Sequence, residues 1–143
     1  MGWDDASASC TQSGLHWSGD STLNGLTWSA RPWSGSSAYA DSKLHDLILA
    51  FALARKWPDV LSNALEPGWV ATKMSGPGAP DDLDAGAVTQ VWLATSNDVE
   101  AMVSGQYFYH QKRRATEAAT GDEEIQDRLI EECAKFAGVS LGS

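Results

Sequence analysis

A long apolar stretch that ends just before a proline limits the possible folds of this chain more than any other feature. Between Ser36 and Pro58, few polar residues interrupt the apolar ones. The apolar residues of this stretch include Leu44, Leu47, Ile48, Leu49, Phe51 and Leu53. Ser36 or Ser37 can cap a helix, and Pro58 pushes Trp57 out of helical geometry. We therefore predict one long helix that ends near Lys56 and is buried against a sheet and a second helix.

The residues that follow this helix predict an α/β fold. Residues 60–65 form a short, mostly apolar run that is ended by Pro67 and Gly68, which is typical of a strand. Apolar residues return at helical spacing over residues 85–95, which predicts a second helix. Apolar and polar residues then alternate over residues 105–110, which predicts another buried strand. Helix followed by strand indicates an α/β unit. Ligands bind beyond the carboxyl ends of such strands, and the Pro67-Gly68 turn lies at that end.

Composition divides the chain into three segments. Residues 1–35 are rich in Ser, Gly, Asp and Thr and follow no helical or alternating period, so we predict a loop-rich, poorly ordered segment. Within it, residues 6–12 are too small and polar for a central strand. Residues 36–110 form the α/β unit. Residues 111–143 form a tail, and we interpret its basic residues 112–114 as a solvated turn.

The tail contains one clear helix signal. Thr120 and Glu123 have the spacing of a capping box, which predicts an amphipathic helix over residues 121–137. Its apolar stripe consists of Ile125, Leu129, Cys133 and Phe136. We expect this stripe to dock on the core.

Composition also excludes several functional classes. The hydrophobic fraction is 43% and the charged fraction 20%, as in a globular domain. Ten Lys and Arg against nineteen Asp and Glu give a net charge of −9, so we expect no nucleic-acid partner. Cys10 and Cys133 suggest neither a disulfide framework nor a zinc site, and we expect no metal site. No run approaches the ~20 apolar residues of a membrane span, and residues 1–5 lack the pattern of a signal peptide. Together with the two scattered cysteines, this leads us to expect a cytoplasmic protein without a membrane partner.

Two residues at the start of the long helix indicate proton chemistry. Tyr39 and Lys43 are four apart, so on a helix they lie on one face. A phenol loses its proton near pH ~10, and a neighbouring cation lowers that pKa. The pair could therefore exchange protons near neutral pH, although residues four apart are also common in ordinary buried helices.

Three segments resemble the short-chain dehydrogenase/reductase family, in that family's order. Residues 36–44, Ser-Ser-Ala-Tyr-Ala-Asp-Ser-Lys-Leu, are similar to its Tyr-x-x-x-Lys helix. Residues 66–72, Glu-Pro-Gly-Trp-Val-Ala-Thr, are similar to its Pro-Gly-x-x-x-Thr segment, and residues 13–16 to its serine segment. The likeness covers residues 13–110, roughly the second half of such a domain. It implies a partial Rossmann-like fold, a doubly wound parallel sheet that carries the later strands and helices.

The resemblance also implies a reaction, which is NAD- or NADP-dependent hydride transfer with a small-molecule carbonyl or alcohol substrate. Tyr39 would move the proton, Lys43 would lower the tyrosine pKa and bind the cofactor ribose, and Ser13 would hold the substrate oxygen. On the residues alone, Ser13 is equally consistent with one of many loop serines. For His16 we expect a loop hydrogen bond.

Further expectations about the cofactor and about partners follow from the same resemblance. Besides Tyr39 and Lys43, the residues that would contact the cofactor are Pro67, Gly68, Val70 and Thr72. Residues 73–82, rich in Gly and Pro, are equally consistent with a substrate lid and with a surface connection. The family's equivalent helix packs against its copy, which implies a homo-oligomer through helix 37–56, with Leu47 and Phe51 as the contacts.

The sequence does not contain the glycine-rich turn that holds the pyrophosphate in a dinucleotide site. Two interpretations follow. In the first, the chain is a fragment of a dehydrogenase/reductase and is inactive on its own, so we expect no binding of NADH or NADPH at micromolar concentration. In the second, the chain is a non-catalytic binding or dimerisation module derived from that family.

Overall fold

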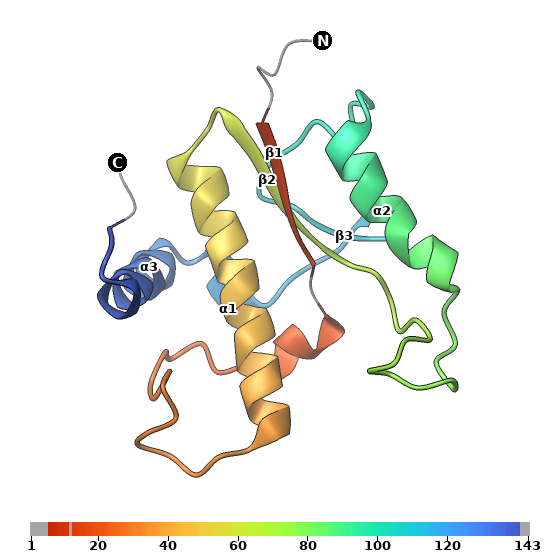
Figure 1. The fold of residues 1–143 in the computed structure, drawn as a ribbon. Helices are drawn as coiled ribbons and strands as arrows, with labels where there is room; N and C mark the ends of the chain where they lie inside the picture. Colours follow the sequence, from red (N-terminus) through yellow and green to blue (C-terminus); the bar gives the residue numbers. More distant parts are fainter. Residues whose placement is uncertain (1–5, 12, 141–143) are drawn as a thin grey trace.

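The computed structural model describes residues 6–11 and 13–140, which form a mixed α/β fold (Figure 1). The elements in chain order are β1 (Ala6–Thr11), the 3-10 helix η1 (Gly14–Ser18), α1 (Gly35–Lys56), β2 (Val60–Glu66), α2 (Leu83–Thr95), β3 (Tyr107–Tyr109), β4 (Lys112–Arg113), the 3-10 helix η2 (Ala118–Gly121) and α3 (Glu123–Ala137). The predicted helix and strand after residue 36 are confirmed, and α1 ends at Lys56 as expected.

The four strands found among the described residues form one sheet in the order β1-β2-β3-β4. β1 pairs with β2 in parallel from Ala6 opposite Val60 to Thr11 opposite Leu65, and β2 also pairs with β3 in parallel. Only β4 runs antiparallel. Parallel neighbours need crossover connections, which α1 and α2 supply. The predicted parallel sheet is therefore confirmed, with β1 at one edge of the sheet that the described residues form.

Helices cover both faces of this sheet, as in doubly wound folds (Figure 1). Successive side chains of β2 point to opposite faces. Ala64 joins a buried cluster with Leu47 and Tyr107 on the α1 side. Its neighbour Leu65 joins a second cluster with Leu93 of α2 and with Phe108. The expected partial Rossmann-like architecture is thus observed, with α1 on one face and α2 on the other.

The far flank of α1 is covered by residues from distant parts of the chain. Leu44 and Ile48 pack there with Leu23 from the long loop and with Leu129 from α3. All four side chains are buried. The second helix that we expected against α1 is therefore α3 of the same chain, so that residues from each of the three compositional segments share one cluster.

This packing also bears on the predicted oligomer contacts. Leu47 has 0% of its surface exposed, and Phe51 packs against the same cluster beneath α1. Leu47 therefore belongs to the chain's own core and offers no surface contact, whereas Phe51 is only partly buried. Oligomerisation itself stays a prediction.

The polar loop over residues 19–34 is fastened to α1 by a buried carboxylate. Asp41, with 4% of its surface exposed, accepts hydrogen bonds from the backbone N–H of Asp20 at 2.8 Å and from Arg31 at 2.5 Å. The Arg31 guanidinium lies 3.7 Å above the ring of Trp28. At Gly19 the backbone touches α1 so closely that a Cβ would lie 2.6 Å from that of Leu44.

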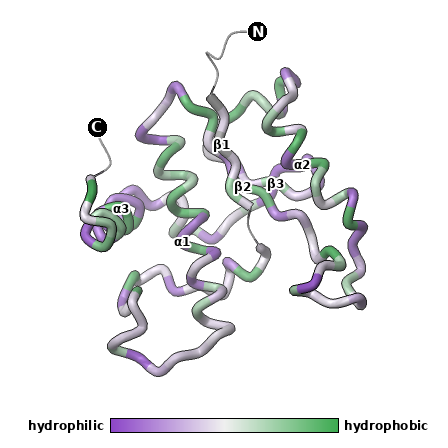
Figure 2. Tube along the Cα trace, in the orientation of Figure 1, coloured by the Kyte–Doolittle hydropathy of each residue, from purple (hydrophilic) through white to green (hydrophobic). Residues whose placement is uncertain are grey.

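The structure corrects the prediction that residues 1–35 are loop from their start, because β1 occupies positions 6–11 at an edge of the described sheet. Parallel strands are joined by backbone groups, and these are available whatever the side chains. Figure 2 shows the contrast that misled the prediction, since β1 is drawn in pale colours and much of α1 in green.

Helix ends and the C-terminal stripe also differ from expectation. α1 is capped by Ser34 rather than by Ser36 or Ser37. α3 is capped by Asp122, whose carboxylate accepts from the backbone N–H groups of residues 124 and 125, whereas Thr120 is buried in η2. The stripe docks only at its start, since Cys133 is exposed and Phe136 is 62% exposed.

The basic residues 112–114 are exposed as predicted, but residues 112 and 113 form β4 rather than a turn. Among the described helices, none is both long and apolar enough to cross a membrane.

Candidate active site

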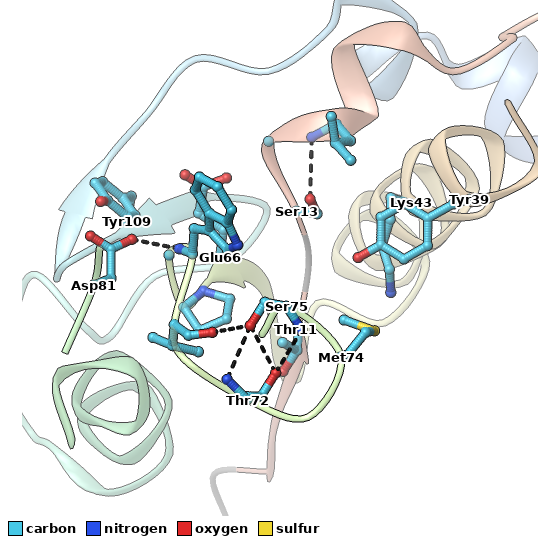
Figure 3. Close-up of a pocket in the computed structure, with 16 residues that line it drawn as sticks. Thr11, Ser13, Tyr39, Lys43, Glu66, Thr72, Met74, Ser75, Asp81 and Tyr109 are labelled. Carbon is cyan, nitrogen blue, oxygen red and sulfur yellow. Dashed lines mark hydrogen bonds between the residues drawn. The ribbon is translucent and has the colours of Figure 1, made fainter. Parts of the chain in front are cut away.

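A cavity of about 900 Å³ opens where the carboxyl ends of β1 and β2 meet the start of α1. Every residue that the sequence predicted for catalysis or cofactor binding lines it: Ser13, Tyr39, Lys43, Pro67, Gly68, Val70 and Thr72. These residues come from three separate segments. Figure 3 shows Tyr39 and Lys43 on one side of the cavity and Glu66, Asp81 and Tyr109 on the other.

Tyr39 and Lys43 lie in the second and third turns of α1, so the helix itself sets their spacing. The Lys43 ammonium is 5.7 Å from the centre of the Tyr39 ring, which confirms that the two side chains lie together. Lys43 also pairs with Asp46 at 3.5 Å. No described residue forms a hydrogen bond with the Tyr39 hydroxyl, so that group is available to a ligand in the cavity.

Ser13 is positioned by η1 and by the histidine three residues later. Its hydroxyl caps η1 by accepting a hydrogen bond from the backbone N–H of Leu15 at 3.3 Å. The Nδ1 atom of His16 donates to the Ser13 carbonyl at 2.8 Å, which confirms the predicted loop hydrogen bond. His16 has 0% of its surface exposed, and its Nε2 has no partner among the described residues. The buried side chain of His16 therefore holds the backbone of Ser13 in place.

The turn after β2 depends on Gly68. Its φ of +91° is one that side-chain-bearing residues rarely adopt, and a Cβ there would lie 2.5 Å from Oδ2 of Asp81. The same oxygen accepts the backbone N–H of Trp69 at 2.5 Å. Asp81 returns a backbone hydrogen bond to the Trp69 carbonyl at 3.1 Å. These contacts close the base of the loop between residues 70 and 81.

Thr72 lies inside that loop and is bonded to Ser75. The Thr72 N–H donates to the Ser75 hydroxyl at 3.0 Å, and the two hydroxyls are 3.1 Å apart. Ser75 in turn donates to the carbonyl of Val70. The predicted cofactor-contacting segment is therefore an ordered turn with an exposed threonine. Met74 lies at its tip with 83% of its surface exposed.

Glu66 is a cavity residue to which sequence reasoning assigned no role. It ends β2, and the buried hydroxyl of Tyr107 on β3 donates to its Oε2 at 2.6 Å. Burial, together with this carboxylate, raises the pKa of the Tyr107 phenol above its usual range. The position of Glu66 just before Pro67, at the carboxyl end of a parallel strand, was the available signal.

In the part of the chain that the structure describes, no group of three or more His, Cys, Asp or Glu side chains could hold a metal ion.

Comparisons with known proteins find relatives that cover most of the chain. No family model matches it. The chain is 35% identical over 133 residues to the short-chain dehydrogenase chry4 of Gibberella zeae, covering 90% of this chain and 51% of that protein. It is 31% identical over 131 residues to the short-chain dehydrogenase chyC of Penicillium rubens, covering 89% of this chain and 50% of that protein. The chain thus spans about half the length of these curated relatives.

A solved structure agrees at the level of the fold. An uncharacterized protein from Mycobacterium paratuberculosis superposes with a TM-score of 0.78 and 19% identity, covering 97% of this chain and 52% of that one. At this identity the likeness shows the fold alone.

Proposed function

Because the chain is related to the short-chain dehydrogenase/reductase family, we propose that it supplies the proton-transfer and substrate-binding half of an NAD(P)-dependent oxidoreductase. The observation that carries this proposal is one cavity lined by Ser13, Tyr39 and Lys43 together with the Pro67-Gly68 turn. Three segments far apart in sequence converge there, and each carries the group that the proposed reaction needs.

Each side chain has a task that its geometry suits. The unbonded hydroxyl of Tyr39 donates a proton to the substrate oxygen in reduction and accepts one in oxidation. The Lys43 ammonium lies 5.7 Å from the centre of the Tyr39 ring, beside the proton donor and within the same cavity. The Ser13 hydroxyl, held at the start of η1, orients the substrate oxygen. Because the three side chains act as one unit, the effects of removing them should not add.

The nicotinamide end of a cofactor fits the remaining wall. Gly68 lines the cavity and lets the backbone turn sharply after β2 with Asp81 packed against it. Lys43, Val70 and Thr72 line the same cavity and would hold the ribose and the carboxamide. When bound, the nicotinamide supplies or accepts the hydride.

The pyrophosphate end of the cofactor needs a glycine-rich turn, which this sequence does not contain. We therefore propose that the chain is inactive on its own. β1 is an edge strand of the described sheet, so a dinucleotide-binding segment can extend the sheet there. Such a segment would come from the rest of a longer reading frame.

The test compares this chain with the longest protein that its reading frame encodes. The chain alone should not bind NADH or NADPH at micromolar concentration, whereas the longer protein should bind and oxidise one of them with carbonyl substrates. In the longer protein, Tyr39→Phe should lower kcat by about 100-fold or more, because a positioned acid or base contributes about that much. The cofactor Kd should stay within about threefold of wild type.

Ser36→Ala is the matched control, because Ser36 is an exposed residue of the same helix outside the cavity. It should leave kcat unchanged. Full activity of Tyr39→Phe would refute the assigned proton transfer, and tight cofactor binding by this chain alone would refute the need for a further segment.

A further inference from the structure

Glu66 presents a fixed hydrogen-bond acceptor to the cavity. Tyr107, with 4% of its surface exposed, donates to Oε2 at 2.6 Å and so orients the carboxylate. Among the described residues, Oε1 accepts no hydrogen bond, and no Lys or Arg forms an ion pair with Glu66. One oxygen is therefore held by the protein and the other is open to a ligand.

The carboxylate lies close to the residue that is proposed to hold the substrate oxygen. A Cβ added at Gly14, next to Ser13, would lie only 3.1 Å from Glu66 Oε2. The partner tyrosine is fixed as well, because its ring stands edge-on to the buried ring of His16, with the ring centres 5.1 Å apart. The packing of Tyr107 against His16 holds the Tyr107 hydroxyl in place, and this hydroxyl in turn holds the Glu66 carboxylate. The orientation of Glu66 therefore does not depend on a bound ligand.

The second carboxylate of the cavity is not available in the same way. Asp81 accepts the backbone N–H of Trp69 at 2.5 Å and lies against Gly68, so it is used to close a turn. Each of the two carboxylates thus keeps one oxygen that accepts no hydrogen bond from the described residues, but Asp81 is committed to the turn, whereas Glu66 lies beside the Ser13 segment.

The mouth of the cavity favours an apolar ligand body. Leu15, Trp69 and Met74 line the cavity with 55%, 60% and 83% of their surfaces exposed. A ring or aliphatic skeleton that rests on them removes apolar surface from water. Lys43 places one cation in the same cavity, where Asp46 already pairs with it at 3.5 Å, and the net charge of −9 adds a field that attracts cations and repels anions.

We propose that Glu66 selects substrates that combine an apolar body with a hydrogen-bond-donating group, above all an ammonium, and that it disfavours substrates carrying a carboxylate. This inference rests on the proposed oxidoreductase function for the identity of the substrate oxygen, while the preference itself is a property of binding. An O–H or N–H of the ligand donates to Oε1, and an ammonium adds charge attraction to that bond.

Three aryl ketones of similar size test the preference on this chain, without cofactor: acetophenone, 4-(aminomethyl)acetophenone and 4-acetylbenzoate. Titrations are followed by the amide chemical shifts of Gly14 and Trp69, which both line the cavity. The wild type should bind the ammonium compound about tenfold more tightly than acetophenone and bind the carboxylate most weakly, since a bond to a charged group contributes about that factor.

Glu66→Gln keeps an oxygen that accepts from Tyr107, so the packing should survive. In this variant the three Kd values should converge to within about threefold. Glu100→Gln removes the same charge from an exposed position outside the cavity and should keep the wild-type order. An unchanged order in Glu66→Gln, tightest binding of 4-acetylbenzoate, or no binding of any probe to the wild type would overturn the proposal.

These outcomes are separable from those of the hydride-transfer test. If Glu66→Gln leaves the order of Kd values unchanged while Tyr39→Phe lowers kcat as expected, only the proposed substrate selection by Glu66 is overturned. An intact preference with fully active Tyr39→Phe would overturn the proposed catalysis and leave the binding preference standing.

Discussion

Gly68→Ala tests the turn that forms one wall of the cavity. The substitution meets two obstacles, which are the backbone φ of +91° and a Cβ placed 2.5 Å from Asp81 Oδ2. A left-handed backbone costs a side-chain-bearing residue about 1–2 kcal/mol. To relieve the contact, the Asp81 carboxylate must move away and release the Trp69 N–H. That exposed bond to a charged group contributes about 1.5 kcal/mol, at the low end of its class.

The two effects together predict a loss of about 3 kcal/mol in the free energy of unfolding. With a urea m-value of about 2 kcal/mol per M, the midpoint should fall by about 1.5 M at an unchanged m. Urea titration followed by far-UV circular dichroism measures this. A domain of ordinary stability, about 5–15 kcal/mol, stays folded in the variant at zero denaturant.

Two glycines of the same loop serve as controls. Gly76 has a φ of +79° with no atom within 4 Å of an added Cβ, so Gly76→Ala should lose only the backbone part, about 1–2 kcal/mol. Gly78 has open space and no positive φ, so Gly78→Ala should be neutral or stabilise by up to about 1 kcal/mol.

Combining Gly68→Ala with Asp81→Ala should bring the cost of the glycine change down to that of Gly76→Ala, because the obstructing carboxylate is gone. Equal losses for Gly68→Ala and Gly76→Ala in the wild-type background would refute the reasoning, since the contact with Asp81 would then have no energetic weight.

Two further predictions concern the sheet and the C-terminal helix. Tyr107→Phe should lose about 1–2 kcal/mol at neutral pH by removing the bond to Glu66. Because the folded-state pKa of Tyr107 is raised, the wild type keeps this stability below pH ~10 and loses it as pH rises further. Urea titrations at pH 8 and above pH 10 should therefore show the difference in unfolding free energy between the two proteins narrowing. A constant difference would contradict the assignment. Leu129→Ala should cost about 2–5 kcal/mol because Leu129 is 2% exposed, whereas Phe136→Ala should stay within about 0.5 kcal/mol; thermal unfolding of both variants checks the order, and the opposite order would refute the docking of α3.

The elements with strong side-chain patterns were the ones that sequence reasoning predicted correctly. α1 has a continuous apolar run ended by Pro58, and β2 has an apolar run ended by Pro67. Tyr39 and Lys43 were expected on one face because helical geometry alone brings residues four apart together. These inferences needed only local information.

β1 was not predicted because its side chains are small and carry no hydrophobic pattern. Its strand conformation comes from pairing with β2 over residues 6–11, and backbone hydrogen bonds rather than residue types make that pairing. The predicted N-cap of α3 was wrong for another reason. Thr120 and Asp122 are both good capping residues two positions apart, and only the tertiary burial of Thr120 in η2 decides between them.

The contact between Glu66 and Tyr107 was beyond local reasoning too. The two residues are 41 positions apart, and they meet because β2 and β3 pair with Ala64 opposite Tyr107. A single sequence does not state which strands are neighbours or in which register. The residue proposed to select substrates is therefore the one that had to be found in three dimensions.

The cluster of Leu23, Leu44, Ile48 and Leu129 can be completed only late in synthesis of the chain. The ribosome makes the first three residues long before the fourth, so α1 leaves the exit tunnel with an apolar flank that α3 has yet to cover. Until then, that flank is a surface to which chaperones and other nascent chains bind. A stop codon anywhere before residue 129 would leave it open permanently and turn a folding intermediate into an aggregation-prone product.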